Sequence, residues 1–181
     1  DRTQRAGVWH RLHQEDLCQL MSLPPERKYQ YERGSSLKQI GRFLRTHLRR
    51  EDREAVLQAL YRQVVFKTLA LDADAHAKNY SLMLSGRSVA LAPVYDTASM
   101  AAFAESHDDL ISPFKIGDEY RLEHITHRDL LTAGTDLGLT EATAATTVAE
   151  MVQLIPDAFE HAAATLPAAP IIARTLEQLS Q

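Results

Sequence analysis

The stretch Leu71-Asp72-Ala73-Asp74-Ala75-His76-Ala77-Lys78-Asn79-Tyr80-Ser81 places a carboxylate, Asp74, five residues before an amide, Asn79. A further carboxylate, Asp96, follows 17 residues after Asn79, in the run Val94-Tyr95-Asp96. Phosphoryl transfer uses such a set: one carboxylate orients a hydroxyl nucleophile, while an amide and a second carboxylate hold divalent metal ions. The five-residue gap alone is weak evidence, because Asp and Asn often occur at that distance by chance. Its combination with Asp96 predicts a phosphotransfer site.

The residues before this stretch predict a buried helix that leads directly into it. Side chains that suit a buried face recur at helical spacing at Leu57, Leu60, Tyr61, Val64, Val65 and Thr68. The pattern predicts a long helix that ends near Ala70. The Asp-x-x-x-x-Asn spacing is that of the protein-kinase catalytic loop, which a buried helix also delivers. The order of elements therefore supports the motif.

A β-hairpin is predicted between Asn79 and Asp96. Ser81 to Leu84 and Ser88 to Leu91 are short apolar runs on either side of Ser85-Gly86-Arg87, where glycine permits a tight turn. Such a hairpin carries the chain back towards its start, so Asn79 and Asp96 are expected to lie close together.

Two helices are predicted near the N-terminus. One extends from Gln14 to Met21 and is stopped by Leu23-Pro24-Pro25, because the residue before a proline disfavours the helical conformation. The other is capped by the Ser35-Ser36 pair. Its apolar face consists of Leu37, Ile40, Leu44 and Leu48.

The pattern after Leu122 is again helical. Thr140 is expected to cap a helix that Pro156 bends or breaks. One face of this helix consists of Val148, Met151, Val152 and Ile155. A further helix near Thr97 is an alternative in which Asp96 serves as its cap. The expected fold class is therefore mainly α, a helical bundle with one small β-hairpin next to the catalytic loop.

The composition is that of an ordinary globular domain. The chain has 181 residues, 45% of them apolar and 24% charged, which fits one domain with a sizeable core. The single cysteine, Cys18, excludes an intrachain disulfide and fits a cytoplasmic location. No apolar stretch approaches the length of a membrane span. A net charge of −4 argues against a globally basic nucleic-acid binder.

The local sequence resembles the C-terminal kinase lobe of the HipA family. The members of this family are bacterial serine/threonine-kinase toxins of toxin–antitoxin systems. The resemblance is carried by Asp74-Ala75-His76-Ala77-Lys78-Asn79-Tyr80-Ser81 and by Leu91-Ala92-Pro93-Val94-Tyr95-Asp96-Thr97-Ala98-Ser99. It continues in His13-Gln14-Glu15-Asp16-Leu17-Cys18, in Lys28-Tyr29 and in Lys115-Ile116-Gly117-Asp118-Glu119-Tyr120-Arg121-Leu122. It spans residues 1–139, and the C-terminal part is similar only in its helical character.

This resemblance implies a role for each residue of the motif. Asp74 is implied to position or deprotonate an incoming Ser or Thr hydroxyl, and Lys78 to neutralise phosphate charge. Asn79 and Asp96 are implied to hold Mg²⁺ with bound ATP. His76 is grouped with them on the nucleotide side of the site.

Each of these residues also has a purely structural alternative. Asp74 suits a solvated loop, Lys78 an ordinary surface position, and Asn79 an Asx turn. Asp96 suits a helix cap, and His76 suits packing within the loop. The sequence alone leaves these alternatives open.

The motif departs from ordinary protein kinases at two points. Ala73 stands where an Arg usually precedes the catalytic Asp, so activation by a phosphate that docks on such an Arg is not expected. No Gly follows Asp96 and Thr97 either, which is a departure that HipA-like sequences share.

A basic stripe is expected on the second helix, opposite its apolar face. It consists of Lys38, Arg42, Arg45 and Arg49. A solvated helix face is the simpler interpretation. The family resemblance also permits contact with phosphate or an acidic partner, including DNA through a HipB-like antitoxin.

The sequence contains no Gly-rich loop, and no Lys on a nucleotide-binding strand precedes the long helix. In HipA-like proteins these parts belong to an N-terminal lobe, so residues 1–181 are expected to form a HipA-like C-terminal kinase domain without its N-lobe. Two functions then remain. One is an Mg-dependent Ser/Thr kinase lobe that is active when an N-lobe is present. The other is a catalytically incomplete remnant that binds an antitoxin or another partner. The sequence does not identify the protein substrate.

Overall fold

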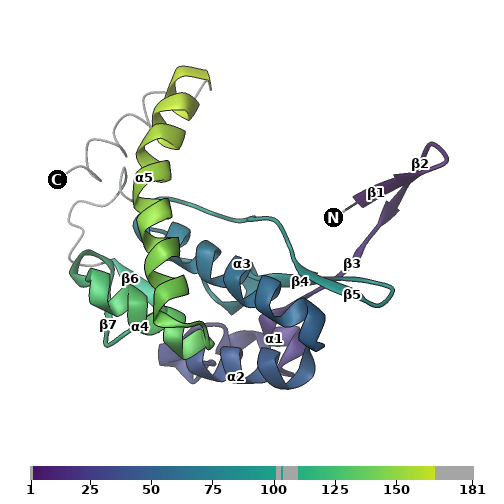
Figure 1. The fold of residues 1–181 in the computed structure, drawn as a ribbon, viewed down its shortest axis with the longest axis horizontal. Helices are drawn as coiled ribbons and strands as arrows, with labels where there is room; N and C mark the ends of the chain where they lie inside the picture. The colour runs from purple at the N-terminus through teal and green to yellow at the C-terminus, as the bar shows by residue number, and fades with distance from the viewer. Residues whose placement is uncertain (1, 101–102, 104–109, 166–181) are drawn as a thin grey trace.

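The chain folds into a helical body with three small antiparallel sheets (Figure 1). The computed structural model describes residues 2–100, 103 and 110–165. The body is built from α2 (Leu37–His47), α3 (Arg50–Leu69), α4 (His127–Leu137) and α5 (Glu141–Thr165). The stretch from Ala162 to Pro170, which is rich in Ala, Pro and Thr, continues beyond the last described residue, Thr165.

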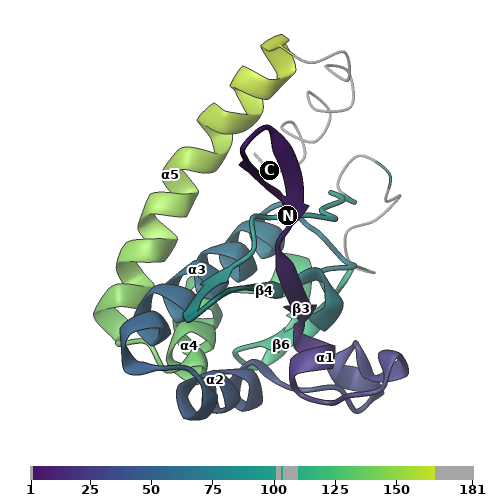
Figure 2. The same ribbon diagram turned by 90° about the vertical axis from the view of Figure 1, so that its right-hand side faces the viewer.

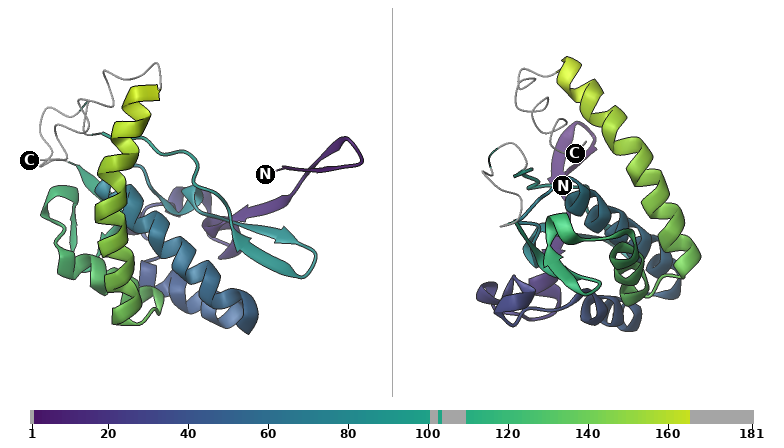
Figure 3. Two further views of the ribbon diagram at one scale, coloured as in Figure 1. Left: turned by 45° about the horizontal axis from the view of Figure 1, so that its top comes forward. Right: turned by 90° about the vertical axis from the view of Figure 1, so that its left-hand side faces the viewer.

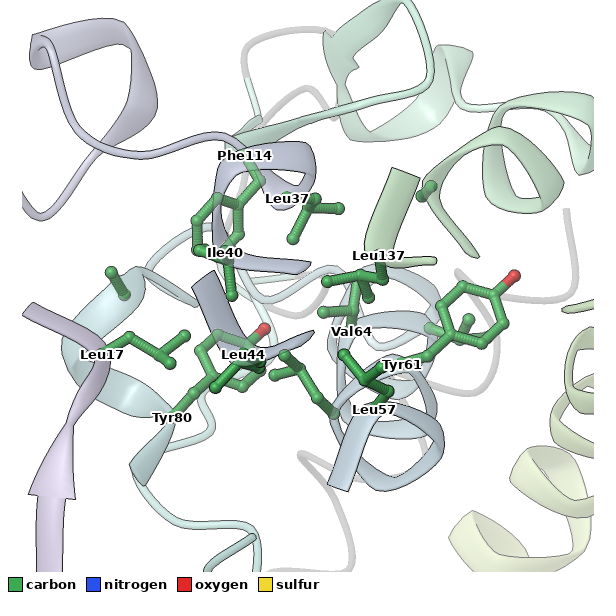
Figure 4. Packing of buried hydrophobic residues seen from close by; sticks show 14 of the residues in the cluster. Leu17, Leu37, Ile40, Leu44, Leu57, Tyr61, Val64, Tyr80, Phe114 and Leu137 are labelled. Atoms are coloured by element: carbon green, nitrogen blue, oxygen red, sulfur yellow. The ribbon is translucent and has the colours of Figure 1, made fainter. Parts of the chain in front are cut away.

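Helix α3 is the centre of the core. It contacts α2, α4, α5 and the strand β5, so it is covered on several sides. A helix in this position needs apolar residues around most of its circumference, which explains its long run of buried side chains. Val64 and Val65 are 2% and 0% exposed, which confirms the predicted buried helix. In Figure 4, Leu57, Tyr61 and Val64 of α3 gather with Leu37, Ile40 and Leu44 of α2 and with Leu137 of α4.

The predicted hairpin beside the candidate loop is present. It consists of β4 (Ser81–Ser85) and β5 (Ser88–Leu91), which pair antiparallel. Gly86 has a φ of +60° at the turn, a left-handed conformation that glycine adopts without steric cost. A third strand, β3 (His13–Asp16), pairs with the other edge of β4 (Figure 2). This three-stranded sheet fixes the position of the chain immediately after the candidate loop.

The predicted helix from Gln14 to Met21 is wrong in its first half. Residues His13–Asp16 form strand β3, and only Leu17–Leu20 form a helix, α1. Pairing with β4 satisfies the backbone of β3, and this contact over a long sequence distance is invisible in the local pattern. Asp16 ends the strand and caps the helix, because its carboxylate accepts from the Gln19 amide N–H at 2.8 Å.

The prediction of a single hairpin is also wrong, because two more sheets are present. Strands β1 (Arg2–Arg5) and β2 (Val8–Arg11) form a hairpin that projects away from the helical body (Figures 1 and 3). Ala6 and Gly7 have positive φ at its turn. Its residue Trp9 is 65% exposed, as expected for a ribbon that packs on little else.

The third sheet consists of β6 (Ile111–Ile116) and β7 (Glu119–Arg121). Phe114 and Ile116 of β6 are 2% and 1% exposed and belong to the main core. Strand β6 also contacts α4 and the short 3-10 helix η2 (Gln30–Glu32). The segment Ile111–Ile116 contains Pro113 and has no sustained alternation of buried and exposed residues, so the sequence pattern does not indicate a strand here.

The ends of the helices follow the expected capping chemistry. Ser36 caps α2 through its hydroxyl, which accepts from the Gln39 amide N–H at 3.2 Å. Thr126 caps α4 in the same way through Asp129. No helix begins near Thr97, so the alternative in which Asp96 is a helix cap is wrong.

Helix α5 continues through Pro156 to Thr165, so of the two predicted effects of this proline, a bend or a break, the break does not occur. Pro156 cannot donate to the carbonyl of Val152, one turn earlier. Val152 is 53% exposed, so water can satisfy this carbonyl. Within the described ranges, no helix, α5 included, is both long enough and apolar enough to cross a membrane.

The expected basic stripe on α2 is only partly a solvated face. Lys38, Arg42 and Arg49 are exposed. Arg45 is half-buried and donates from its guanidinium to the Leu137 carbonyl at 2.5 Å, so it fastens α2 to the C-terminal end of α4.

Candidate active site

The candidate loop begins where α3 ends. Ala70 closes the helix, and Leu71 then takes a φ of +54°, which turns the chain sharply. The Asp72 amide N–H donates back to the Lys67 carbonyl at 2.9 Å. The loop ends in a short 3-10 helix, η3 (Ala77–Asn79), which leads into β4. The loop is thus fixed at one end by the central helix and at the other by the sheet.

Asn79 brings the two predicted acidic segments together. Its side-chain amide donates to the carbonyl oxygen of Asp74 at 2.8 Å and to that of Asp96 at 3.4 Å. Asn79 is 2% exposed, so both contacts are shielded from water. The side-chain nitrogen of Asn79 therefore holds the two backbone segments together. The side-chain oxygen of Asn79, Oδ1, has no hydrogen-bond partner among the described residues.

Asp96 has a strained but supported backbone. Its φ is +50°, which is uncommon for a residue other than glycine. Its carbonyl accepts from Asn79 and also from the Lys67 ammonium group at 3.1 Å. The Asp96 carboxylate is exposed and forms no hydrogen bond or ion pair with the rest of the described chain. The backbone is therefore held while the charged group is left available.

A buried ion pair lies beneath the loop. Lys67 of α3 and Asp72 are each 1% exposed, and the Lys67 Nζ lies 3.4 Å from the Asp72 Oδ2. Lys67 also donates to the carbonyls of Tyr95 and Asp96, each at 3.1 Å. Burial lowers the pKa of the Lys67 ammonium group, and the charge of Asp72 opposes this shift. One side chain thus ties the end of α3 to the segment that carries Asp96.

Asp72 connects the same two segments from the other side. Its carboxylate accepts from the Asp74 amide N–H at 3.1 Å and from the Ala98 amide N–H. Burial raises the pKa of the Asp72 carboxyl group, and the positive charge of Lys67 is the largest opposing effect. Its Oδ2 accepts no hydrogen bond, so its contact with Lys67 is mainly electrostatic.

Tyr95 provides a third connection between the loop and the Asp96 segment. Its hydroxyl donates to the Lys78 carbonyl at 2.6 Å and lies 2.6 Å from the Ser81 hydroxyl. Because Tyr95 immediately precedes Asp96, these contacts fix the distance between Asp96 and the end of the loop.

Asp74 is the most accessible group of the loop, and its side chain is 60% exposed. Its Oδ1 accepts a hydrogen bond from the Tyr29 hydroxyl. The His76 Nε2 lies 3.7 Å from the same oxygen. Asp74 therefore faces solvent with one oxygen engaged.

His76 and Lys78 occupy different environments. His76 is 6% exposed, and burial lowers the pKa of its imidazole group despite the nearby Asp74. Its Nδ1 is buried without a hydrogen-bond partner. Lys78 is half-buried, and its ammonium group forms no ion pair within the part of the chain that the structure describes. His76 thus lies inside the loop, as its structural alternative predicts, while Lys78 keeps an uncommitted charge.

The donor set fits Mg²⁺. The Asn79 Oδ1 and the Asp96 carboxylate are hard oxygen donors without other partners among the described residues. Mg²⁺ retains waters and binds phosphate oxygens, so two protein side chains are sufficient. No cluster of three or more His, Cys, Asp or Glu side chains suited to a metal occurs in residues 2–100, 103 and 110–165. An amide with a carboxylate is therefore the arrangement that this loop offers.

Sequence reasoning missed the residues that support the site: Lys67, Asp72, Tyr95 and Tyr29. One signal was present for Lys67, because it lies next to Thr68 on the apolar face of a buried helix. A charged residue in such a position requires a partner, and Asp72 was the nearest acid after the helix. The contact between Tyr29 and Asp74 joins residues 45 positions apart, and no local pattern indicates it.

Comparison with known proteins identifies relatives of this chain. The family model described as "HipA-like C-terminal domain" matches residues 1–159. "Putative kinase Y4mE" of Sinorhizobium fredii is 36% identical over 99 residues, which cover 55% of this chain and 23% of that protein. "Putative kinase Y4dM" of the same organism is 29% identical over 178 residues, which cover 98% of this chain and 40% of that protein.

A solved structure with the same fold is that of the Shewanella oneidensis MR-1 toxin–antitoxin system HipA, with HipB and operator DNA. Its TM-score is 0.83 at 23% identity, and the match covers 99% of this chain and 45% of the other. The chain thus spans less than half the length of each of these relatives. The family model covers most of the chain, and the chain therefore belongs to the family of HipA-like C-terminal domains.

Proposed function

We propose that this chain is the C-terminal lobe of an Mg-dependent serine/threonine protein kinase of the HipA type. In this function it transfers the γ-phosphate of ATP to a protein hydroxyl when an N-lobe is present. The observation that carries the proposal is the Asn79 side chain, whose amide group joins the backbones of Asp74 and Asp96. The names of the two Sinorhizobium fredii relatives also favour kinase chemistry.

Each residue of the candidate site has a separate role in this proposed reaction. Asp74 accepts the proton of the substrate Ser or Thr hydroxyl. At the same time the hydroxyl oxygen of the substrate forms a bond to the γ-phosphorus, and the bond between the γ-phosphorus and the ADP oxygen breaks. Lys78 offers a positive charge on the loop to the phosphate oxygens. Asn79 and Asp96 would hold Mg²⁺ through the Asn79 Oδ1 and the Asp96 carboxylate. Bound Mg²⁺ neutralises phosphate charge and orients the phosphates. His76 packs beneath Asp74 and maintains the shape of the loop.

The Shewanella oneidensis assembly, which contains HipA, HipB and operator DNA, supports a proposal about partners. By this likeness we propose a HipB-like antitoxin as a partner, with DNA reached through it. The exposed Lys38 and Arg42 of α2, with Arg49 at the start of α3, offer the charge for such contacts.

The test is phosphate transfer by the chain combined with an N-lobe, measured with radiolabelled ATP and a protein acceptor. Asp74→Asn is expected to lower kcat by at least about a hundredfold and leave the fold intact, because the lost group receives the proton and packs on no core residue. Asp96→Asn is expected to weaken nucleotide and Mg²⁺ binding as well, because its carboxylate acts in the ground state too.

Asp118→Asn is the matched control, since Asp118 is an exposed acid outside the loop. It is expected to retain wild-type transfer. Full activity in Asp74→Asn would contradict the catalytic assignment. An inactive wild type that still binds a HipB-like protein would favour the alternative of a non-catalytic binding module.

A further inference from the structure

A short segment before α2 forms one wall of the candidate site. It includes η1 (Pro25–Arg27) and η2, and it reaches the loop through Tyr29. Tyr29 is half-buried and lies between these two short helices. Its hydroxyl is the only side-chain donor to the Asp74 carboxylate within the described residues.

We propose that Tyr29 is a positioning residue that fixes the Asp74 carboxylate through its Oδ1 and thereby presents the Oδ2 to the acceptor hydroxyl. This inference rests on the proposed kinase function. Asp74 lies on a loop with its side chain 60% exposed, so without a partner its carboxylate samples several rotamers. A base that is oriented by a third group keeps a productive geometry for proton transfer.

The geometry around Asp74 separates its two oxygens. The Oδ1 is engaged by Tyr29 and also faces the His76 Nε2 at 3.7 Å. The Oδ2 has no hydrogen-bond partner among the described residues. The engaged oxygen therefore turns towards the protein, and the other remains for the substrate.

The Tyr29 ring is held on several sides. It stacks on Tyr31 with the ring centroids 5.2 Å apart, and it meets His76 edge to face at 5.2 Å. The Lys28 Nζ lies 4.8 Å from the centroid of the Tyr29 ring. Burial raises the pKa of the Tyr29 hydroxyl, and its bond to Asp74 raises it further, so the group remains a donor at neutral pH.

The backbone at Tyr29 is tied to the loop as well. The Ala77 amide N–H donates to the Lys28 carbonyl at 3.1 Å, and the Gly34 amide N–H donates to the Tyr29 carbonyl at 2.9 Å. A Cβ at Gly34 would lie 2.5 Å from that same carbonyl oxygen, so only glycine fits this approach. The position of Tyr29 is thus fixed by contacts that do not involve Asp74, which is what a positioning group requires.

The kinetic test compares Tyr29→Phe with Tyr31→Phe in the chain combined with an N-lobe. Tyr29→Phe keeps the ring contacts and removes only the hydroxyl. It is expected to lower kcat about tenfold or more and leave the KM values for ATP and the acceptor unchanged. Tyr31→Phe removes an exposed hydroxyl that bonds to none of the described residues, so its kcat is expected to match the wild type.

A second arm needs no activity and uses the 181-residue chain alone. Urea unfolding of Tyr29→Phe, Asp74→Ala and the double variant gives a double-mutant cycle. The effects of the two changes on the free energy of unfolding are expected to be non-additive, because both remove the same hydrogen bond. Additive effects would overturn the contact on which the inference stands.

The outcomes separate the two proposals. An active wild type with unchanged kcat in Tyr29→Phe overturns the role of Tyr29 and leaves the kinase function in place. An inactive wild type overturns the proposed function and the positioning role with it. A raised KM with unchanged kcat would place Tyr29 in substrate binding and would also overturn the inference.

Discussion

At the residue scale, the position of the candidate site depends on charged side chains that are buried beneath it. Lys67 and Asp72 are 1% exposed, and they connect the end of α3, the candidate loop and the Asp96 segment. Burying two charges is costly, and their attraction offsets that cost only while both remain. This pair therefore contributes more to the position of Asp96 than to the net stability of the fold.

Lys67→Met is expected to destabilise the chain by about 3–5 kcal/mol, because it leaves the Asp72 charge buried without compensation. Adding Asp72→Asn to this variant is expected to recover much of the loss. The measurement is the free energy of unfolding in urea, followed by far-UV circular dichroism. Lys115→Met breaks the exposed ion pair with Asp118 and serves as the control, with little expected change. A Lys67→Met protein as stable as the wild type would contradict the structural role of the pair.

At the scale of the elements, the helices pack closely where small residues allow it. Helix α2 crosses α4 at Gly41, where a Cβ would lie 2.4 Å from the Leu137 carbonyl oxygen and 2.6 Å from the Leu137 Cα. These contacts are to backbone atoms, so no side-chain rotation relieves them. The crossing keeps α2 against the body, and the wall that carries Tyr29 lies directly before the Ser36 cap of this helix.

Gly41→Ala is therefore expected to lower the free energy of unfolding by about 1–3 kcal/mol, because the overlap outweighs the higher helix propensity of alanine. Arg42→Ala, on the exposed face of the same helix, is the control and is expected to change stability little. Thermal and urea unfolding of both variants check the prediction. A stabilised Gly41→Ala protein would show that the two helices can separate without cost.

The elements also show what the sequence can and cannot predict. The buried helix with Val64 and Val65, the hairpin at Gly86 and the cap at Ser36 follow from local periodicity and turn chemistry. The strands β3 and β6 do not. Strand β3 pairs with β4, a segment far away in the chain, and β6 contains Pro113 and has no sustained alternation of buried and exposed residues. The motif led to Asp74, Asn79 and Asp96. It did not lead to Tyr29, whose partner lies 45 residues away.

At the scale of the whole molecule, the candidate site lies on a surface of this chain and is supported from one side. In the proposed function, the loop, the Asp96 segment and Tyr29 supply a positioned base, oxygen donors and a positive charge. The described residues include no Gly-rich loop to cover the phosphates. Preorganised groups on both sides of the phosphates are what such sites use to stabilise the transition state.

The 181-residue chain alone is accordingly expected to show little or no ATP hydrolysis or phosphate transfer, and an N-lobe added in cis or as a separate chain is expected to restore Mg-dependent transfer. Radiolabelled transfer by both preparations, with and without Mg²⁺, is the measurement. Efficient turnover by the chain alone would contradict the need for a second lobe.

The projecting hairpin β1–β2 has a practical consequence for anyone who follows these experiments optically. Trp9 is the only tryptophan of the sequence, and at 65% exposure it lies on this ribbon, apart from the core around α3. Its fluorescence therefore reports on the ribbon, and melting of the helical body is expected to leave the emission nearly unchanged. Because Trp9 is exposed and lies away from the core, its fluorescence is expected to change when another chain binds to the hairpin β1–β2.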